Sequence, residues 1–277
     1  MKKTCNCKIV LFSDLHYASE RPVNNGSIID RKLTELALPV IDKLIEKINT
    51  KIKPDIVFNL GDLVEDFNDK QADLNNLAFI WNRLKSINCP FYSVTGNHDL
   101  RSMDSRKDIE NIMWGGEHST FSIDFNGYHF VVLSLDVNQE KGREFGGIYK
   151  THNISDEDLE WLKSDLDKNK LPCILLTHFG IAEDNMKGNW WFEKNPDHGL
   201  LGNRDKLKQI IKTDKNLIAV FSGHQHWTKF HIENGISYFV LGSLTEDIND
   251  DGVPDGVYFE IDLNGKNISI LEHHIRL

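Results

Sequence analysis

Residue types that bind metal ions or move protons recur in five short blocks of the chain. These blocks are Asp14-Leu15-His16, Gly61-Asp62, Gly96-Asn97-His98-Asp99, His178 and Gly223-His224-Gln225-His226. Directly before them stand apolar runs typical of buried strands: 8–13, 55–60, 91–95, 173–177 and 217–222. Because ligands bind at the carboxyl ends of parallel strands, we expect the five blocks to meet at one edge of the fold.

The donor types in these blocks define the chemistry that they could support. Carboxylate, amide and imidazole groups without thiolates suit manganese, iron or zinc better than magnesium alone. Eight or so donors are too many for one tetrahedral ion, but they suit two ions about 3.5–4 Å apart that share a carboxylate. Such a pair activates a water molecule and neutralises charge on a phosphoryl group. The blocks therefore predict hydrolysis of a phosphate ester at a two-metal centre.

Each block also has a simpler structural interpretation when it is taken alone. Asp14-Leu15-His16 could be a turn from strand to helix with a capping aspartate, and Gly61-Asp62 and residues 96–99 have the composition of turns. Two histidines that flank one residue after a buried strand, as in His224-Gln225-His226, are harder to explain structurally. Only the joint occurrence of all five blocks favours the metal centre.

The elements that must position these blocks can be expected from apolar spacing. We expect helices over 28–49, bent or divided at Pro39, and over 73–87, 155–167 and 204–212, with Ser155 capping the third. A hairpin is expected over 120–124 and 128–136 around Asn126-Gly127. Strands and helices alternate early and strands dominate after Trp227. This order predicts an α/β layered fold with two sheets and a single domain over residues 1–277.

Composition and charge restrict the class of protein. Hydrophobic residues make up 40% of the chain and charged residues 27%, as in ordinary globular proteins. The formal net charge of -10 is opposite to that of a binder of duplex nucleic acid, although bound cations would let an acidic protein act on phosphates. No run is long enough to span a membrane, and the apolar run after Lys8 is short for a signal peptide. We expect a cytoplasmic protein with four free thiols, and the oligomeric state stays open.

Taken together, the five blocks resemble the signature blocks of the calcineurin-like metallophosphoesterase superfamily, in the same order over residues 14–226. The resemblance implies a four-layer sandwich of two mixed β-sheets flanked by helices, and two divalent or trivalent ions of manganese, iron or zinc. It implies Asp14, His16 and His226 for the first ion, Asn97, His178 and His224 for the second, and Asp62 as the bridge. It also implies that His98 acts beside the metals, as general acid or as a donor to the transition state, and that Asp99 orients it.

The resemblance leaves the substrate open. The protein phosphatase branch has the patterns G-D-x-V-D-R-G and R-G-N-H-E, whereas this chain has Gly61-Asp-Leu-Val-Glu-Asp66 and Thr95-Gly-Asn-His-Asp99. The chain is more similar to bacterial-type phosphodiesterases, including cyclic-nucleotide and ADP-ribose-type hydrolases. We expect a phosphodiesterase or nucleotide pyrophosphatase that acts on a small molecule. The alternatives are a phosphomonoesterase and a non-catalytic scaffold on the same fold.

Several segments outside the blocks have two interpretations. Residues 179–203, which include Trp190 and Trp191, could be a substrate lid or could cover a local core. The acidic stretch 247–255 matches the first half of a calcium loop but lacks its final glutamate, and an acidic turn fits better. Four residues could reach the substrate: Asn25, Arg31, His152 and His198. The remaining histidines are expected to be surface or satisfied core residues: His118, His129, His231, His273 and His274.

Overall fold

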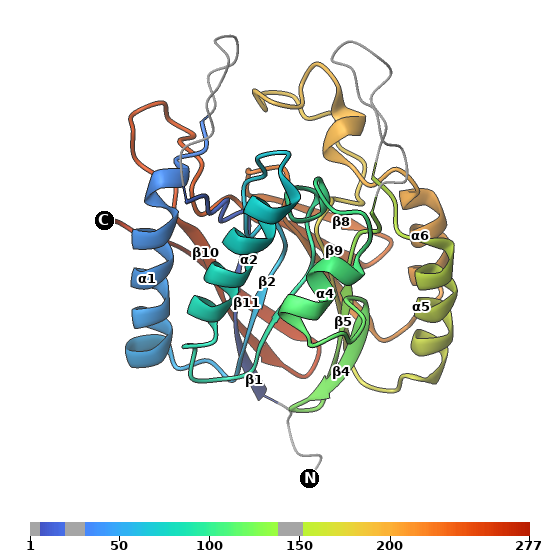
Figure 1. Cartoon of the computed structure of the whole chain (residues 1–277). Coiled ribbons are helices and arrows are strands. Elements are labelled where there is room, and N and C mark those ends of the chain that lie inside the picture. The colour runs from blue at the N-terminus through green and yellow to red at the C-terminus, as the bar shows by residue number, and fades with distance from the viewer. Residues whose placement is uncertain (1–5, 20–30, 138–151) are drawn as a thin grey trace.

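Two mixed β-sheets lie face to face between helices in the computed structural model, which describes residues 6–19, 31–137 and 152–277 (Figure 1). The first sheet has the order β11-β10-β1-β2-β3. Its strands are β1 (Asn6–Phe12), β2 (Ile56–Asn59), β3 (Phe91–Ser93), β10 (Val257–Asn264) and β11 (Asn267–His274). Strands β1, β2 and β3 are parallel, whereas β10 is antiparallel to both β1 and β11.

The second sheet has the order β4-β5-β6-β7-β9-β8. Its strands are β4 (Phe121–Phe125), β5 (Tyr128–Leu133), β6 (Cys173–Thr177), β7 (Leu217–Ser222), β8 (Lys229–Glu233) and β9 (Ile236–Val240). Strands β5, β6, β7 and β9 are parallel, and β4 and β8 pair antiparallel at the two edges. The predicted α/β fold with two mixed sheets is thus confirmed.

Alternating side chains explain why both faces of each sheet are buried. On β1, Ile9 and Leu11 point between the sheets, where they join Phe130 of β5, while Val10 and Phe12 pack toward the helices. All five side chains are at most 1% exposed. Because successive residues of a strand face opposite sides, this continuous apolar run fills two hydrophobic layers at once.

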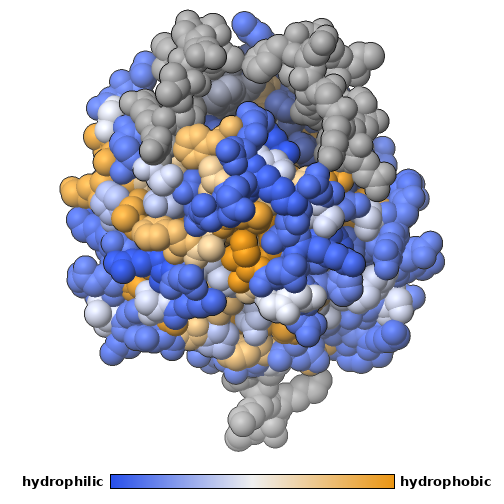
Figure 2. Space-filling view, in the orientation of Figure 1, coloured by the Kyte–Doolittle hydropathy of each residue, from blue (hydrophilic) through white to orange (hydrophobic). Residues whose placement is uncertain are grey.

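Helices cover the outer faces of the two sheets (Figure 1). The four main helices are α1 (Ala37–Lys47), α2 (Lys70–Leu84), α5 (Asp156–Lys168) and α6 (Arg204–Ile211). Shorter ones are α3 (Asn97–Leu100) and α4 (Lys107–Met113), together with the 3-10 helices η1 (Thr34–Leu36) and η3 (Pro196–Gly199) and the π-helical turn η2 (Ile48–Ile52). None of the described helices is long and apolar enough to cross a bilayer. Hydrophilic side chains predominate on the face seen in Figure 2, with apolar areas scattered among them.

Most of the predicted elements are present, with corrections near the first helix. The Oγ atom of Ser155 accepts a hydrogen bond from the Asp158 N–H at 3.0 Å, as its capping role requires. The hairpin turn has positive φ at Asn126 and Gly127. Pro39 does not bend the first helix, because it lies in the first turn of α1, where its missing N–H is not needed. The short helix α4 was not predicted.

Candidate metal centre

The five sequence blocks follow the carboxyl ends of parallel strands from both sheets. Asp14 and His16 follow β1, Asp62 follows β2, and Asn97 begins α3 directly after the loop that leaves β3. The second sheet contributes three more side chains, which come from the loops after β6 and β7: His178, His224 and His226. All seven residues are at most 8% exposed. The loops gather at the upper end of the molecule in Figure 1.

One group of donor atoms comes from Asp14, His16 and His226. The Nε2 atoms of the two imidazoles are 3.0 Å apart. Asp14 Oδ1 is 3.2 Å from His226 Nε2 and 3.8 Å from His16 Nε2. Donors about 2.1 Å from one ion lie about 3.0 Å apart at right angles and about 3.4 Å apart in a tetrahedron. The three side chains therefore have the spacing of ligands around one cation.

A second group surrounds Asp62. Its Oδ2 atom is 3.3 Å from His178 Nε2, and His178 Nε2 is 3.2 Å from Asn97 Oδ1. His224 also offers a donor to this group, because one of its ring nitrogens lies within 4.8 Å of donor atoms of Asp62 and His178. Asp62 Oδ2 is 3.9 Å from His16 Nε2, so the Asp62 carboxylate joins the two groups.

Each of the four imidazoles has an oxygen atom beside its outer nitrogen, and for His178, His224 and His226 this contact is a hydrogen bond. His16 Nδ1 faces Glu65 Oε2 at 2.8 Å, and His226 Nδ1 faces Glu246 Oε2 at 2.7 Å. Backbone carbonyls serve the other two rings: Leu60 O for His178 Nδ1 at 2.7 Å, and His198 O for His224 Nε2 at 3.1 Å. These acceptors place the ring proton on the outer nitrogen. The inner nitrogen is then left as a lone-pair donor, as in metal-bound histidines.

The centre attracts positive charge. Burial lowers the pKa of His226, yet the carboxylates of Asp14 and Glu246 raise it to about 10. For Asp62 the signs are opposite: burial raises the pKa of its carboxyl group, but His178 and His98 hold this pKa well below its usual value. Asp14 Oδ1 and Asp62 Oδ2 are buried and accept no hydrogen bond from any described residue. Such buried carboxylate oxygens need a cation or a proton beside them, so the donor set fits a pair of metal ions.

The backbone at the candidate ligands is unusual. Five of the seven have positive φ: Asp14 (55°), His16 (48°), Asp62 (52°), His224 (66°) and His226 (50°). This left-handed region is unfavourable for most residues, and Asp, Asn and His tolerate it better than others. Strained backbone of this kind gathers at functional sites, where the surrounding fold enforces it.

The glycines that open two of the blocks are explained by close approach. A Cβ atom on Gly96 would overlap the backbone and carboxylate of Asp62. On Gly223 it would overlap Ser13 and lie 2.6 Å from Asp14 Oδ2. Only glycine lets these chain segments pass so close to the two carboxylates.

His98 lies beside the centre, but its partner differs from the one expected. His98 Nδ1 is 2.6 Å from Asp66 Oδ2 and 3.4 Å from Glu65 Oε2. The expectation that Asp99 orients His98 is wrong, because both Asp99 oxygens accept backbone hydrogen bonds from Asp62, Leu63, Val64 and Gly96 at 2.9–3.2 Å. Asp99 therefore shapes the loop that holds Asp62. Burial and the nearby Asp62 carboxylate raise the pKa of Asp99 to about 6.

Four residues around the centre were not expected from the sequence. Glu65, Asp66 and Glu246 hold the imidazoles described above. Lys32 Nζ lies 2.7 and 2.8 Å from the two oxygens of Glu65 and 3.5 Å from His98 Nε2. Lys32 is placed by its backbone pairing with Glu246. The available signal was weak: two acids, Glu65 and Asp66, follow Asp62 after two apolar residues, but Lys32 and Glu246 stand in stretches without a motif.

The segment 179–203 contacts the centre from the side of β6. The Phe179 ring stacks on the His224 ring with centroids 3.7 Å apart, and the Phe192 ring is 5.1 Å from it. Phe192 also belongs to a small apolar cluster with Met186 and Leu200. This part of the segment therefore covers a local core, one of the two interpretations that the sequence left open.

Trp190 of the same segment lies closer to the surface. Its side chain is 38% exposed, and its Nε1 atom donates a hydrogen bond to Glu246 Oε1 at 3.2 Å. The Arg31 guanidinium lies 4.6 Å from the centroid of its ring, and the Trp191 ring is 4.1 Å away. Trp190 thus links the segment to a carboxylate that holds a candidate metal ligand.

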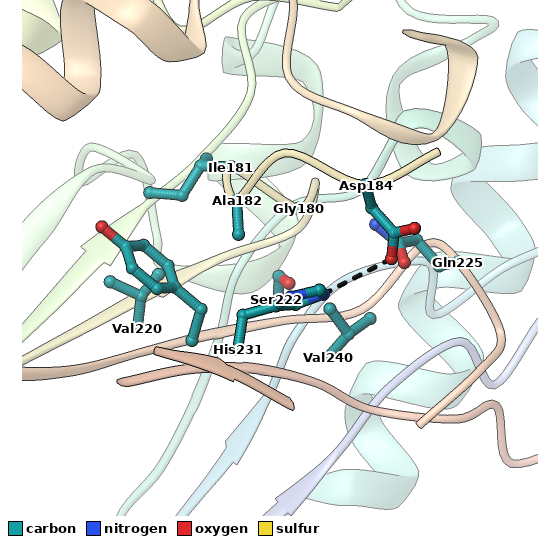
Figure 3. A pocket seen from close by; sticks show the side chains of 10 residues that line it. Gly180, Ile181, Ala182, Asp184, Val220, Ser222, Gln225, His231 and Val240 are labelled. Carbon is teal, nitrogen blue, oxygen red and sulfur yellow. Dashed lines mark ion pairs between the residues drawn. The ribbon is translucent and has the colours of Figure 1, made fainter. Parts of the chain in front are cut away.

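The remaining residues singled out in the sequence have simpler roles in the structure. Asp247 accepts hydrogen bonds from the backbone of Asp251 and Gly252, as in an acidic turn. His129 is buried between Asp124 and Asp165. Asn25 and Cys5 lie outside the described residues. A cavity between Gly180 and Gln225 measures about 10 Å³ and has room for about one water molecule, so it cannot hold a substrate (Figure 3).

Comparison with known proteins agrees with this geometry. The family model described as calcineurin-like phosphoesterase matches residues 7–228. A probable glycerophosphodiester phosphodiesterase GpdQ from Arcobacter nitrofigilis is 23% identical over 243 residues, which are 87% of this chain and 79% of that protein. A probable cyclic nucleotide phosphodiesterase from Psychrobacter sp. is 21% identical over 208 residues, which are 71% of this chain and 54% of that protein.

Solved structures show the same fold. A dimetal phosphatase from Danio rerio superposes with a TM-score of 0.69 over 98% of this chain and 99% of that one, at 14% sequence identity. A purple acid phosphatase from yellow lupin superposes with a TM-score of 0.61 over 98% of this chain and 52% of that one, also at 14% identity.

Proposed function

Since the chain belongs to the calcineurin-like phosphoesterase family and is a phosphoric ester hydrolase, we propose that it cleaves small phosphodiesters at a two-metal centre. One observation carries the proposal: four buried imidazoles, each with a carboxylate or carbonyl oxygen beside its outer nitrogen, surround two buried carboxylates. We assign the first ion to Asp14, His16 and His226, the second to Asn97, His178 and His224, and the bridge to Asp62.

The ions would lower the pKa of a water molecule, so that hydroxide forms near neutral pH, and would neutralise charge on the phosphoryl oxygens. The chain itself supplies orientation and proton transfer. Glu65 and Glu246 fix the rings of His16 and His226. Asp66 holds Nδ1 of His98, so Nε2, which also contacts Lys32 Nζ at 3.5 Å, is the ring nitrogen that remains for proton transfer to the leaving oxygen.

Two observations favour a diester over a monoester. The two curated relatives described above are named as probable phosphodiesterases. The carboxylates of Glu65, Asp66 and Glu246 stand around the candidate ligands. Burial raises the pKa values of all three, but neighbouring histidine, lysine and arginine side chains bring them below their usual values. A singly charged diester is repelled less by these carboxylates than a doubly charged monoester.

The test combines metal analysis with paired substrates. After chelation and addition of manganese, the protein should bind two ions and hydrolyse bis-p-nitrophenyl phosphate with a higher kcat/KM than p-nitrophenyl phosphate. Asp62→Asn should abolish hydrolysis and lower the metal content. Asp262→Asn is the matched control, since it changes an exposed carboxylate on β10.

The result could contradict the proposal in two ways. A higher kcat/KM for the monoester would support the phosphomonoesterase alternative. A folded protein that binds no metal and hydrolyses neither ester would support the scaffold alternative.

A further inference from the structure

Strand β8 forms an edge of the second sheet and carries two large exposed apolar side chains. Phe230 is 53% exposed and Ile232 is 68% exposed. No described strand pairs with the outer side of β8. The Phe230 ring stacks on Phe239, which stacks on Phe221, so the exposed pair continues an aromatic row that begins in the core. An apolar edge strand of this kind is a template for pairing with another chain.

The turn after β8 fixes which backbone groups face outward. Asn234 and Gly235 both have positive φ, as in a type I′ turn, and Glu233 pairs with Ile236 across it. In such a two-residue hairpin the closing pair is hydrogen bonded, and hydrogen-bonded pairs then alternate along the strands. Lys229, His231 and Glu233 therefore turn their N–H and C=O groups toward β9. The corresponding groups of Phe230 and Ile232 face the open edge.

The charges on β8 complement those of a second, antiparallel copy of the strand. In a two-fold pairing centred on His231, Phe230 lies opposite Ile232 of the second copy, and Lys229 lies opposite Glu233. Within one chain, Lys229 is 2.6 Å from Asp184, and Glu233 is 3.1 Å from Lys208. The pairing would therefore place Asp184–Lys229 of one copy beside Glu233–Lys208 of the other, while His231, 3.4 Å from Asp184, meets its own copy at the two-fold axis.

From this self-complementarity we infer that the protein forms a homodimer through antiparallel pairing of two β8 strands. The two six-stranded sheets would then join into one continuous sheet across the two-fold axis. On one face of the new strand pair, Phe230 of each copy packs against Ile232 of the other. The charged pairs lie on the opposite face. None of the seven candidate ligands lies on β8, so the dimer does not rest on the proposed hydrolysis.

The mass of the full-length protein in solution tests the dimer. Sedimentation equilibrium over a wide concentration range should show a reversible monomer–dimer equilibrium for the wild type, and Ile232→Lys should be monomeric. Leu271→Lys is the matched control, because Leu271 is 59% exposed on β11, an edge of the other sheet, and its replacement should leave the dimer intact. Circular dichroism and thermal melting verify that both variants are folded.

Cysteine cross-linking tests the register without destabilising the contact. His231 faces its own copy in a non-hydrogen-bonded pair, with Cα atoms about 4.5 Å apart, which suits a disulfide. His231→Cys should form a covalent dimer under mild oxidation. Glu233→Cys should not, because its Cα would be about 13 Å from its copy. A monomeric wild type at every concentration, a dimer that only Leu271→Lys dissociates, or cross-linking through position 233 alone would overturn the inference.

Discussion

Replacing Glu246 by glutamine tests how the first metal group is held. One oxygen of this buried carboxylate accepts a hydrogen bond from His226 Nδ1 at 2.7 Å, and the other accepts one from Trp190 Nε1 at 3.2 Å. A glutamine amide of the same shape has a single acceptor oxygen, so Glu246→Gln loses one of the two hydrogen bonds and the negative charge. Loss of such an outer partner weakens metal binding about 10–100-fold, which corresponds to about 1.4–2.7 kcal/mol.

Calorimetric titration of chelator-treated protein with manganese measures this loss. Trp190→Phe removes only the indole donor and keeps the charge on Glu246, so its effect on metal affinity should be small. Glu193→Gln removes an exposed carboxylate from the same segment and should leave metal affinity unchanged. The difference between Glu246→Gln and Trp190→Phe then isolates the contribution of the carboxylate to His226.

Two outcomes would refute the reasoning. If Glu246→Gln is folded and binds manganese as tightly as the wild type, Glu246 does not orient a metal ligand. If Trp190→Phe weakens binding as much as Glu246→Gln does, the indole contact, and not the charge, holds the ring of His226.

Three further predictions concern proton transfer, pH and metal removal. Asp66→Asn should lower turnover about 10²-fold while both metals stay bound, because Asp66 pairs with His98 and Arg101 and not with a candidate metal ligand; loss of metal would contradict this. Burial lowers the pKa of His129, but hydrogen bonds to Asp165 and Asp124 raise it above 6.5. The stabilisation by His129 is thus fully present below pH 6.5 and is lost as the pH rises through the raised pKa. In urea unfolding, His129→Gln should therefore lower the free energy of unfolding more at acid pH than at alkaline pH. Chelation should lower Tm and manganese should restore it, because manganese at 100 times its Kd raises the free energy of unfolding by about 2.7 kcal/mol; a Tm that is insensitive to both would argue against the centre.

Much of the fold follows from local patterns. The runs around Ile9 and Leu175 are apolar on both faces, which occurs in sheets that are covered twice, and Asn126-Gly127 permits the positive φ of a hairpin turn. The convergence of the five blocks followed from one rule about parallel strands, without any knowledge of distances. The strands and the hairpin turn depend on residues close together in the sequence, whereas the convergence of the blocks needs only parallel strands.

The partners of the imidazoles could not be expected in the same way. Glu246 meets His226 from a loop 20 residues away, and Lys32 meets Glu65 across 33 residues. Asp99 stands next to His98 in the sequence, but the short helix α3 turns its carboxylate back to the Gly96 N–H. Adjacency along the chain therefore suggested a contact that helical geometry forbids.

The left-handed backbone at the candidate ligands limits how this centre can evolve. Asp14 and His226 occupy conformations that valine, isoleucine and threonine adopt only at high energetic expense. A laboratory library at these positions should therefore yield folded proteins mainly with glycine, asparagine, aspartate or histidine. We expect metal preference to vary instead through residues that contact the ligands, such as Glu65, because the φ angle of Glu65 is not positive.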